Sequence, residues 1–425
     1  MVKNLNIIKR DGSIVKFNKC KIEDAILKAM KYGSGIYEEE IAKKIADEIE
    51  ISCFEKENSP TVYQVENMVY NKLIEYKHEL TAKAYEGYRA VQSFKREVNT
   101  TDDSIIGLLN KTNEEVINEN SNKNGILAST QRDLIAGEVS KDISRRKIIP
   151  AHIVHAHDEG VLHYHDMDYA MQSIHNCMLI NLEDMLQNGT VINNKLVESP
   201  KSFSTACTIV TQIIAQIASG QYGGNTITIR HIAPFLRVSY NKYFNKYKEK
   251  YSEEMAHELA EDRMLEELKS GIQTIRYQLS TLHTSNGQSP FSTIYLEIEE
   301  GHEYEREMAL ICEEMINQRL EGMKNHKGQQ IGEEFPKLVY LLDEHNCLEG
   351  GKYDYITKLA AKCNTKRLVP DYQSAKIMRR NYEGSTFPPM GCRSHLSPWK
   401  DENGNHKWYG RFNQGVISLN LVKAT

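Results

Sequence analysis

Hydrophobic and polar positions at the start of the chain first alternate in short runs and then follow helical spacing. "NIIKRDGSIVKF" has two strand-like runs on either side of Asp11-Gly12, a dipeptide favoured in tight hairpins. In the next segment Ile22, Ile26 and Ala29 share one face of a predicted helix. Three further helical patterns follow. Strands followed by helices predict a small α+β module over residues 1–97.

From residue 126 onward, longer helical patterns alternate with short apolar runs. "VESPKSFSTACTIVTQIIAQIASG" predicts a buried helix, and "HEYEREMALICEEMINQRLEGMK" predicts an amphipathic one. "KLVYLL" and "GVISLNL" are typical of short buried strands in a sheet covered on both faces. This alternation predicts an α/β domain over residues 126–425. The Asn, Thr and Asp content of residues 98–125 favours turns and predicts a linker.

Composition limits the classes of function. The chain has 425 residues, 40% of them hydrophobic and 26% charged, as in globular proteins with more than one domain. The formal net charge of −5 gives no basic field of the kind that nucleic-acid binding requires, so we expect no nucleic-acid partner. The N-terminus has no signal-peptide pattern, and the most apolar stretch is interrupted by glutamines. We expect a cytoplasmic protein with no membrane partner.

One of the eight cysteines has an unusual context. No CxxC pair occurs, which argues against a disulfide framework and a thiolate zinc site. In "FPPMGCRSHLSP", Pro388 and Pro389 fix the backbone, and Gly391 allows a tight turn before Cys392. A rigidly held thiol suits catalysis, because misplacement by about 1 Å can cost much of a rate. An ordinary turn, or a hydrolase dyad of Cys392 with His395, remains an alternative.

Two further patterns precede the apolar run "MLINL". His163, His165 and Asp166 are residue types that bind metals, but we find no further ligand at convincing spacing and predict no metal. Cys177 lies at the start of a predicted buried strand, where a thiol can sit at a pocket mouth. A buried structural cysteine is the alternative interpretation.

The N-terminal hairpin carries cations that could meet at one end of the module. Lys9, Arg10 and Lys21 could contact the phosphates of a nucleotide, or they could form a solvated edge. The string "IIKRDGSIVKFNKCKIEDAILKAM" resembles the ATP-cone, a regulatory nucleotide-binding module, over residues 3–97. The resemblance implies ATP and dATP as allosteric effectors. It also implies that Lys9, Arg10 and Lys21 contact phosphates, with Asn18 as a further candidate.

Ordered motifs along the rest of the chain carry a second resemblance. "NENSNKNG", "LHYHDMDY", "HNCMLINL", "ASGQYGGNTI", "SNGQSPFSTIYLE", "PPMGCRSHLSPWKDENGN" and "GRFNQGVISLNL" together resemble the anaerobic (class III) ribonucleoside-triphosphate reductases, which are glycyl-radical enzymes. The resemblance implies a ten-stranded α/β barrel with Cys392 at a buried loop tip as the thiyl-radical site. It further implies Cys177 as the second active-site cysteine and Asn413 as the active-site asparagine. Formate as reductant, a radical-SAM activating enzyme and a homodimer follow from the same resemblance.

The chain also departs from this family. It contains no RxCGY glycyl-radical motif and no pair of CxxC motifs for the family's zinc. We therefore expect a C-terminally incomplete barrel, inactive alone, with a complementing C-terminal fragment as partner. A nucleotide-binding regulatory or vestigial protein without turnover is the alternative. Gly223, Gly224 and Gly287 are candidates for close approach of the backbone to triphosphates.

Overall fold

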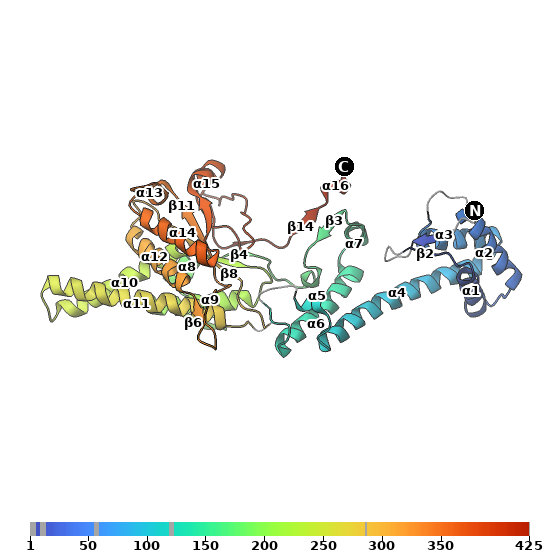
Figure 1. The fold of residues 1–425 in the computed structure, drawn as a ribbon, viewed down its shortest axis with the longest axis horizontal. Coiled ribbons are helices and arrows are strands. Elements are labelled where there is room, and N and C mark those ends of the chain that lie inside the picture. The colour runs from blue at the N-terminus through green and yellow to red at the C-terminus, as the bar shows by residue number, and fades with distance from the viewer. Residues whose placement is uncertain (1–5, 9–13, 55–58, 119–122, 285–286, 425) are drawn as a thin grey trace. The chain divides into compact units, whose positions relative to one another are not determined.

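The computed structural model describes residues 6–8, 14–54, 59–118, 123–284 and 287–424 (Figure 1). The chain forms two compact units, residues 1–104 and 105–425. The division falls inside the segment that the sequence predicts as a linker.

The first unit is a hairpin followed by helices, as its sequence pattern predicts. Strands β1 (Asn6–Ile8) and β2 (Ile14–Lys16) pair antiparallel, with Ile7 opposite Val15. The helices are α1 (Cys20–Ala29), the π-turn η1 (Met30–Ser34), α2 (Glu39–Phe54), α3 (Val62–Glu75) and the first part of α4 (Glu79–Leu109). Ile26, on the predicted apolar face of α1, is fully buried together with Ile45 and Leu73. Apolar side chains from three helices therefore make one core.

Helix α4 includes residues 98–109, whose composition favours turns. Asn, Thr and Asp are less favourable in a helix than Ala by roughly 0.5 kcal/mol each. A helix that has already begun upstream can continue through such residues, because propagation is easier than nucleation. The short helix α5 (Glu114–Ile117) follows and is capped by the side chain of Asn113.

A six-stranded sheet organises the second unit. Its order is β12-β11-β8-β7-β4-β13, and the first five strands are parallel. The strands are β4 (Met178–Leu179), β7 (Asn225–Thr228), β8 (Ser292–Leu296), β11 (Lys337–Leu342), β12 (Asp371–Ser374) and the antiparallel β13 (Arg411–Phe412). The predicted α/β class is confirmed, and "KLVYLL" is the buried strand β11. The sheet is open among the described residues, so closure of ten strands stays a prediction.

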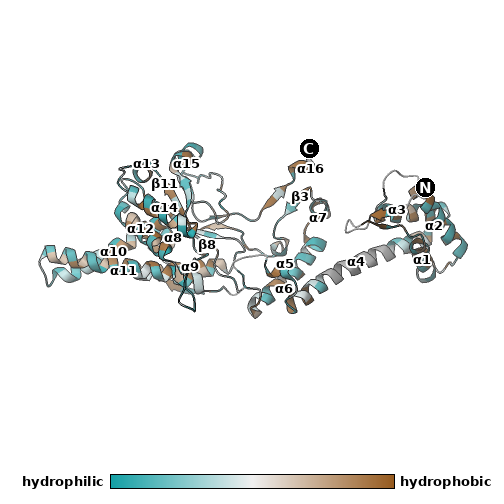
Figure 2. Ribbon diagram, in the orientation of Figure 1, coloured by the Kyte–Doolittle hydropathy of each residue, from teal (hydrophilic) through white to brown (hydrophobic). Residues whose placement is uncertain are grey.

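Helices cover the sheet and build the core with it (Figure 1). The longer ones are α6 (Ala128–Ile143), α9 (Phe203–Ala218), α10 (Ala233–Lys248), α11 (Glu253–Thr281), α12 (Glu305–Glu321) and α14 (Asp354–Arg367). The shorter ones are η2 (Ser144–Ile148), α7 (Ala151–Asp158), η3 (Met167–Tyr169), α8 (Leu182–Gln187), η4 (Ile229–His231), α13 (Glu344–Cys347), α15 (Ala375–Asn381) and α16 (Leu421–Ala424). Strand residues Ile227, Ile294 and Leu338 share one apolar cluster with α9, α11, α12 and α14. In Figure 2 hydrophobic and hydrophilic residues alternate along α10 and α11, as in amphipathic helices.

In the described part of the second unit, three two-stranded pairs lie outside this sheet. They are β5 (Thr190–Ile192) with β6 (Lys195–Val197), β9 (Met323–Lys324) with β10 (Gln330–Ile331), and β3 (Leu162–Tyr164) with β14 (Ile417–Leu419). The expectation that "GVISLNL" forms a buried strand is wrong, because all three residues of β14 are exposed. An apolar run predicts burial only when a second layer covers it, and β14 pairs with β3 in a sheet of two strands.

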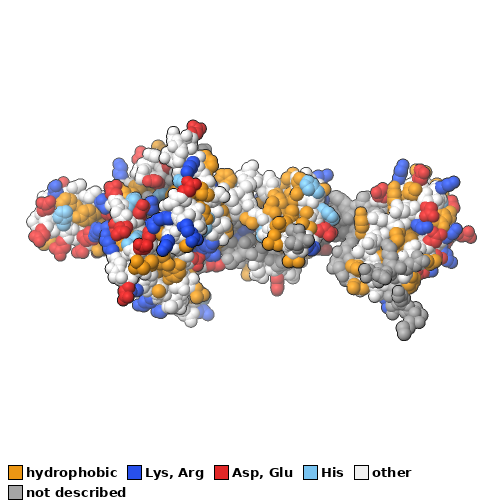
Figure 3. Space-filling view, turned by 90° about the horizontal axis from the view of Figure 1, so that it is seen from above, with side chains coloured by type: hydrophobic (Ala, Val, Ile, Leu, Met, Phe, Trp, Pro, Cys, Tyr) orange, Lys and Arg blue, Asp and Glu red, His pale blue; other side chains and the backbone are white. Residues whose placement is uncertain are grey.

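The described surface carries charges of both signs. On the face shown in Figure 3, acidic and basic side chains are interspersed. Within the described residues, no helix combines the length and apolar character that crossing a membrane requires.

Candidate active site around Cys177 and Cys392

Cys177 is buried directly before β4, with a relative exposure of 2%. The backbone N–H of Gly224 donates to its Sγ at 3.3 Å. Gly223 has no room for a side chain, because a Cβ there would lie 2.5 Å from the carbonyl oxygen of Asn176 and 2.8 Å from Cys177 Sγ. Gly223 and Gly224 thus allow two backbone segments and a thiol to approach closely. The structure shows this packing role, and a role of these glycines toward triphosphates stays a prediction.

Cys392 lies in a tight turn between Met390 and Ser394. The Arg393 N–H donates to the Met390 carbonyl at 2.8 Å, and the Met390 N–H donates to the Ser394 carbonyl at 2.9 Å. The Ser394 hydroxyl lies 2.8 Å from Cys392 Sγ. A Cβ on Gly391 would lie 2.9 Å from the Cα of Gly224, so the turn sits directly on the start of β7. Because Gly391 and Gly224 both lack a side chain, their backbones can approach this closely.

The thiols of Cys177 and Cys392 are neighbours, because the turn that carries Cys392 packs on Gly224, whose N–H donates to Cys177 Sγ. The interaction with Cys392 and burial raise the pKa of Cys177 above the ordinary range of cysteine. The interactions with Cys177 and Ser394 lower the pKa of Cys392. Cys177 therefore keeps its proton, and Cys392 is the group that ionises first. Among the described residues, these are two of eight free cysteines.

Asn413 lies beside Cys177, although 236 positions separate them in the chain. The side-chain carboxamide oxygen of Asn413 accepts a hydrogen bond from the backbone N–H of Cys177 at 2.8 Å. The backbone N–H of Asn413 donates to the backbone carbonyl of Cys177 at 3.1 Å. Its carboxamide nitrogen is 3.5 Å from Asn176 Oδ1. The structure therefore brings together the three residues that the sequence marks as candidates, at the junction of β4, β13 and the Cys392 turn.

The environment of Cys392 differs from the expected buried loop tip, because residue Cys392 is exposed. The physical reason is that the six-stranded sheet is open and its described strands do not enclose the turn. The root of the turn is nevertheless fixed, since Phe387 and Met390 pack with Cys177, Leu179 and Met378 in one apolar cluster.

Other sequence candidates take different places. His395 Nε2 lies 2.7 Å from the Gln373 side chain, and its ring stacks on Tyr382, so its described contacts do not form a hydrolase dyad with Cys392. His165 Nε2 forms a hydrogen bond with Ser418 Oγ at 2.8 Å. Within the described residues, His, Cys, Asp and Glu side chains do not gather in groups of three that could hold a metal. The residues present thus do not fit a zinc ion.

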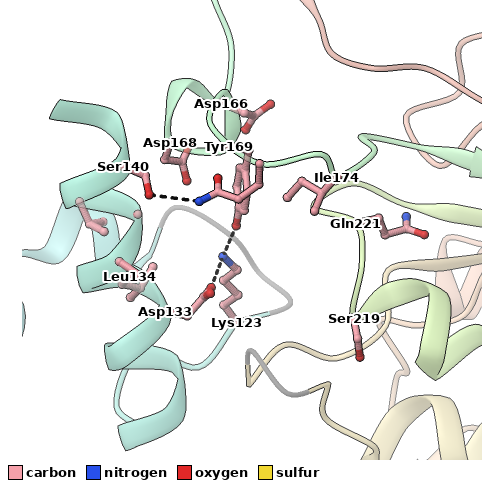
Figure 4. Close-up of a pocket in the computed structure, with 14 residues that line it drawn as sticks. Lys123, Asp133, Leu134, Ser140, Asp166, Asp168, Tyr169, Ile174, Ser219 and Gln221 are labelled. Atoms are coloured by element: carbon pink, nitrogen blue, oxygen red, sulfur yellow. Dashed lines mark hydrogen bonds and ion pairs between the residues drawn. The ribbon is translucent and has the colours of Figure 1, made fainter. Parts of the chain in front are cut away.

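A polar pocket that sequence reasoning missed adjoins this site (Figure 4). It has a volume of about 210 Å³. Lys123, from the motif "NENSNKNG", donates to Tyr169 OH at 2.9 Å and to Asp133 Oδ2 at 3.1 Å. Burial opposes the charge of Lys123, but Tyr169 and Asp133 outweigh it and raise the Lys123 pKa. Gln221 lines the pocket and donates to the carbonyl of Asn176, next to Cys177.

A separate cavity of about 500 Å³ lies in the first unit. Lys16, Lys21 and Lys28 line it together with Asn18, whose side chain also accepts from the Cys20 N–H at 3.0 Å. Asp24 and Glu66 line the same cavity, so the three lysines leave a net positive charge there, which suits a polyphosphate. Lys9 and Arg10, predicted to bind the same phosphates, lie outside the described residues.

Comparisons with known proteins concern the fold and the family of the chain. The fold is similar to the crystal structure of the anaerobic ribonucleotide reductase from Thermotoga maritima with glycerol in the active site. That match has a TM-score of 0.51 and 14% identity, and it covers 78% of this chain and 56% of that one. The fold is thus that of an anaerobic ribonucleotide reductase.

Sequence relatives give the family. Residues 119–425 match the family model of anaerobic ribonucleoside-triphosphate reductase, and residues 5–94 match the ATP cone domain. The chain is 37% identical to the Escherichia coli enzyme of that name over 98% of its own length and 58% of the relative's. It is 39% identical to the enterobacteria phage T4 enzyme over 76% of its length and 53% of the relative's. The chain belongs to the anaerobic ribonucleoside-triphosphate reductase family and spans just over half the length of these relatives.

Proposed function

We propose that this chain takes part in the anaerobic reduction of ribonucleoside triphosphates to deoxyribonucleoside triphosphates, which are DNA precursors. The proximity of Cys177 and Cys392 through Gly224 and Gly391, with Asn413 hydrogen-bonded to the Cys177 backbone, carries the proposal. The relatives of the chain are named for this reaction, and the chain spans 58% of the Escherichia coli relative.

In the proposed reaction the sulfur of Cys392, as a thiyl, takes the hydrogen atom from C3′ of the ribose. The 2′-hydroxyl then gains a proton and leaves as water. Cys177, which its interaction with Cys392 and burial keep protonated, supplies a hydrogen atom to the radical intermediate. Formate then returns a hydrogen atom to Cys177 and gives its second electron to the C3′ ketone, which takes up a proton, and formate becomes carbon dioxide. Cys392 returns its hydrogen atom to C3′ and is again a thiyl, so ribonucleotide, formate and one proton yield deoxyribonucleotide, carbon dioxide and water. The Asn413 carboxamide hydrogen-bonds the ribose hydroxyls and orients the reductant.

Activation requires further partners in this proposal. The family's glycyl-radical motif does not occur within the 425 residues. We therefore include a complementing segment with that motif and a radical-SAM activating enzyme, and we expect no turnover from the 425 residues alone. A homodimer and a cytoplasmic location belong to the same proposal, and the free cysteines of the described chain suit a reducing compartment.

Regulation is proposed to reside in the first unit. ATP or dATP binds with its phosphates toward Lys21, and Lys9 and Arg10 complete the contacts. The three lysines that line the 500 Å³ cavity support this assignment.

Anaerobic turnover of CTP tests the reaction. The chain, the activating enzyme and the complementing segment are incubated with [¹⁴C]formate, and dCTP and ¹⁴CO₂ are measured. Equal amounts of the two products are expected. The variants Cys392→Ser, Cys177→Ser and Asn413→Ala should lower dCTP formation at least 100-fold, since each removes a group that acts in the chemical step, while Cys347→Ser serves as control. If ATP binds but no dCTP forms under any combination, the protein is a nucleotide-binding regulator instead.

A further inference from the structure

Arg393 follows Cys392 directly and has an unusual backbone conformation. Its φ is +69°, in the left-handed region that glycine adopts with least strain. An arginine at such a position needs a compensating interaction. In addition, the reaction proposed above assigns no role to this side chain.

The guanidinium of Arg393 provides that interaction. Its Nε donates to Asp371 Oδ2 at 2.6 Å, and Nη1 donates to Thr293 Oγ1 at 3.2 Å. Nη1 also donates to the Gly391 carbonyl at 3.3 Å, inside the turn that carries Cys392. Thr293 lies near the start of β8, and Asp371 is the first residue of β12. One planar side chain thus joins the turn to two strands.

These two strands are not neighbours, because β11 lies between them. In the sheet register Thr293 is opposite Lys337, and Asp371 is opposite Val339. The guanidinium therefore reaches across the width of β11. Such a span fixes the direction in which the turn leaves the sheet, and Cys392 is the residue directly before Arg393.

We propose that Arg393 is a positioning residue for Cys392: its guanidinium ties the turn to the starts of β8 and β12 and thereby holds Cys392 Sγ against Cys177. The role in turnover rests on the proposed function. The role in placing the thiol does not.

The alkylation of Cys392 by iodoacetamide, followed over a range of pH by mass spectrometry of the digested protein, tests the proposal without turnover. Exposed Cys347 in the same digest is the internal reference. In Arg393→Gly and Asp371→Ala, the midpoint of the Cys392 profile should rise by about one pH unit, because the thiol loses its contacts with Cys177 and Ser394. Arg393→Gly relieves the backbone strain, so its thermal unfolding should stay near that of the wild type.

Two further variants separate positioning from charge. Arg393→Lys keeps the charge but loses the planar fork, so it should resemble Arg393→Gly. Arg380→Lys, an exposed arginine of α15, should leave the profile unchanged. Unchanged midpoints in folded Arg393→Gly and Asp371→Ala, or full rescue by Arg393→Lys, would overturn the proposal. Shifted midpoints in a protein that never forms dCTP would uphold it and refute the proposed function.

Discussion

The variant Gly223→Ala tests the packing that aligns the two thiols. Gly223 does not have a positive φ, so alanine adds no backbone strain, and the effect is steric. The added Cβ would meet the Asn176 carbonyl oxygen at 2.5 Å and Cys177 Sγ at 2.8 Å. Restoring van der Waals spacing requires a shift of roughly 1 Å in the segment before β4. The Gly223 N–H also donates to the Asn176 carbonyl, at 2.9 Å, so that bond must lengthen.

Such overpacking costs about 1–3 kcal/mol of stability, and misplacing a reacting group by about 1 Å costs on the order of 100-fold in rate. The expected result is a folded protein with a modestly lower midpoint in urea and dCTP formation reduced about 100-fold. Gly220→Ala is the matched control, since its Cβ would have the Ile217 carbonyl 3.7 Å away as nearest contact. If Gly223→Ala matched Gly220→Ala in both urea unfolding and turnover, the close packing around Cys177 would not be what aligns the thiols.

Three further predictions concern stability and nucleotide binding. The Glu333 side chain is buried between Arg276 and Arg319, so Glu333→Gln should lower the free energy of urea unfolding by about 3–5 kcal/mol. Glu334 is exposed, so Glu334→Gln should change that free energy little, and equal effects of the two variants would refute the prediction. Burial holds the pKa of His231 at about 3, so as pH falls from 7 to 5 the unfolded state gains a proton that the folded state does not. Between pH 7 and pH 5 the wild type should therefore lose about 2 kcal/mol of its free energy of unfolding, and His231→Phe should not. If the free energies of unfolding of the two proteins changed in parallel with pH, this prediction would be wrong. Lys21→Ala should weaken ATP binding in calorimetry about 10-fold or more, and Lys43→Ala should not; intact affinity in Lys21→Ala would remove that lysine from the site.

Local patterns were sufficient to predict much of the fold. The β1–β2 hairpin, α1 and the parallel strand β11 follow from periodicity within about 15 residues of chain. The failure at β14 has a physical reason: an apolar run does not say which layer will cover it, and here the strand is exposed. The helix through residues 98–109 continues for a similar reason, since propagation from α4 outweighs local propensity.

The candidate site is less accessible to local reasoning. Asn413 and Cys177 are 236 positions apart, and no spacing rule connects them; the family resemblance named both. The packing roles of Gly223 and Gly224 depend on which segments cross there, which a sequence alone does not give. Lys123 was missed because its partners, Asp133 and Tyr169, are identified only by the fold.

The central claim is that Cys177 and Cys392 are in contact, and disulfide mapping tests it most directly. The purified protein is treated briefly with diamide, which oxidises neighbouring thiol pairs, and is then alkylated, digested and analysed by mass spectrometry. The account predicts that Cys177 and Cys392 form the first disulfide among the eight cysteines, and that the Gly223→Ala variant forms it more slowly. Pairing of Cys392 with another cysteine, or a Cys177 that stays reduced while other disulfides form, would contradict it.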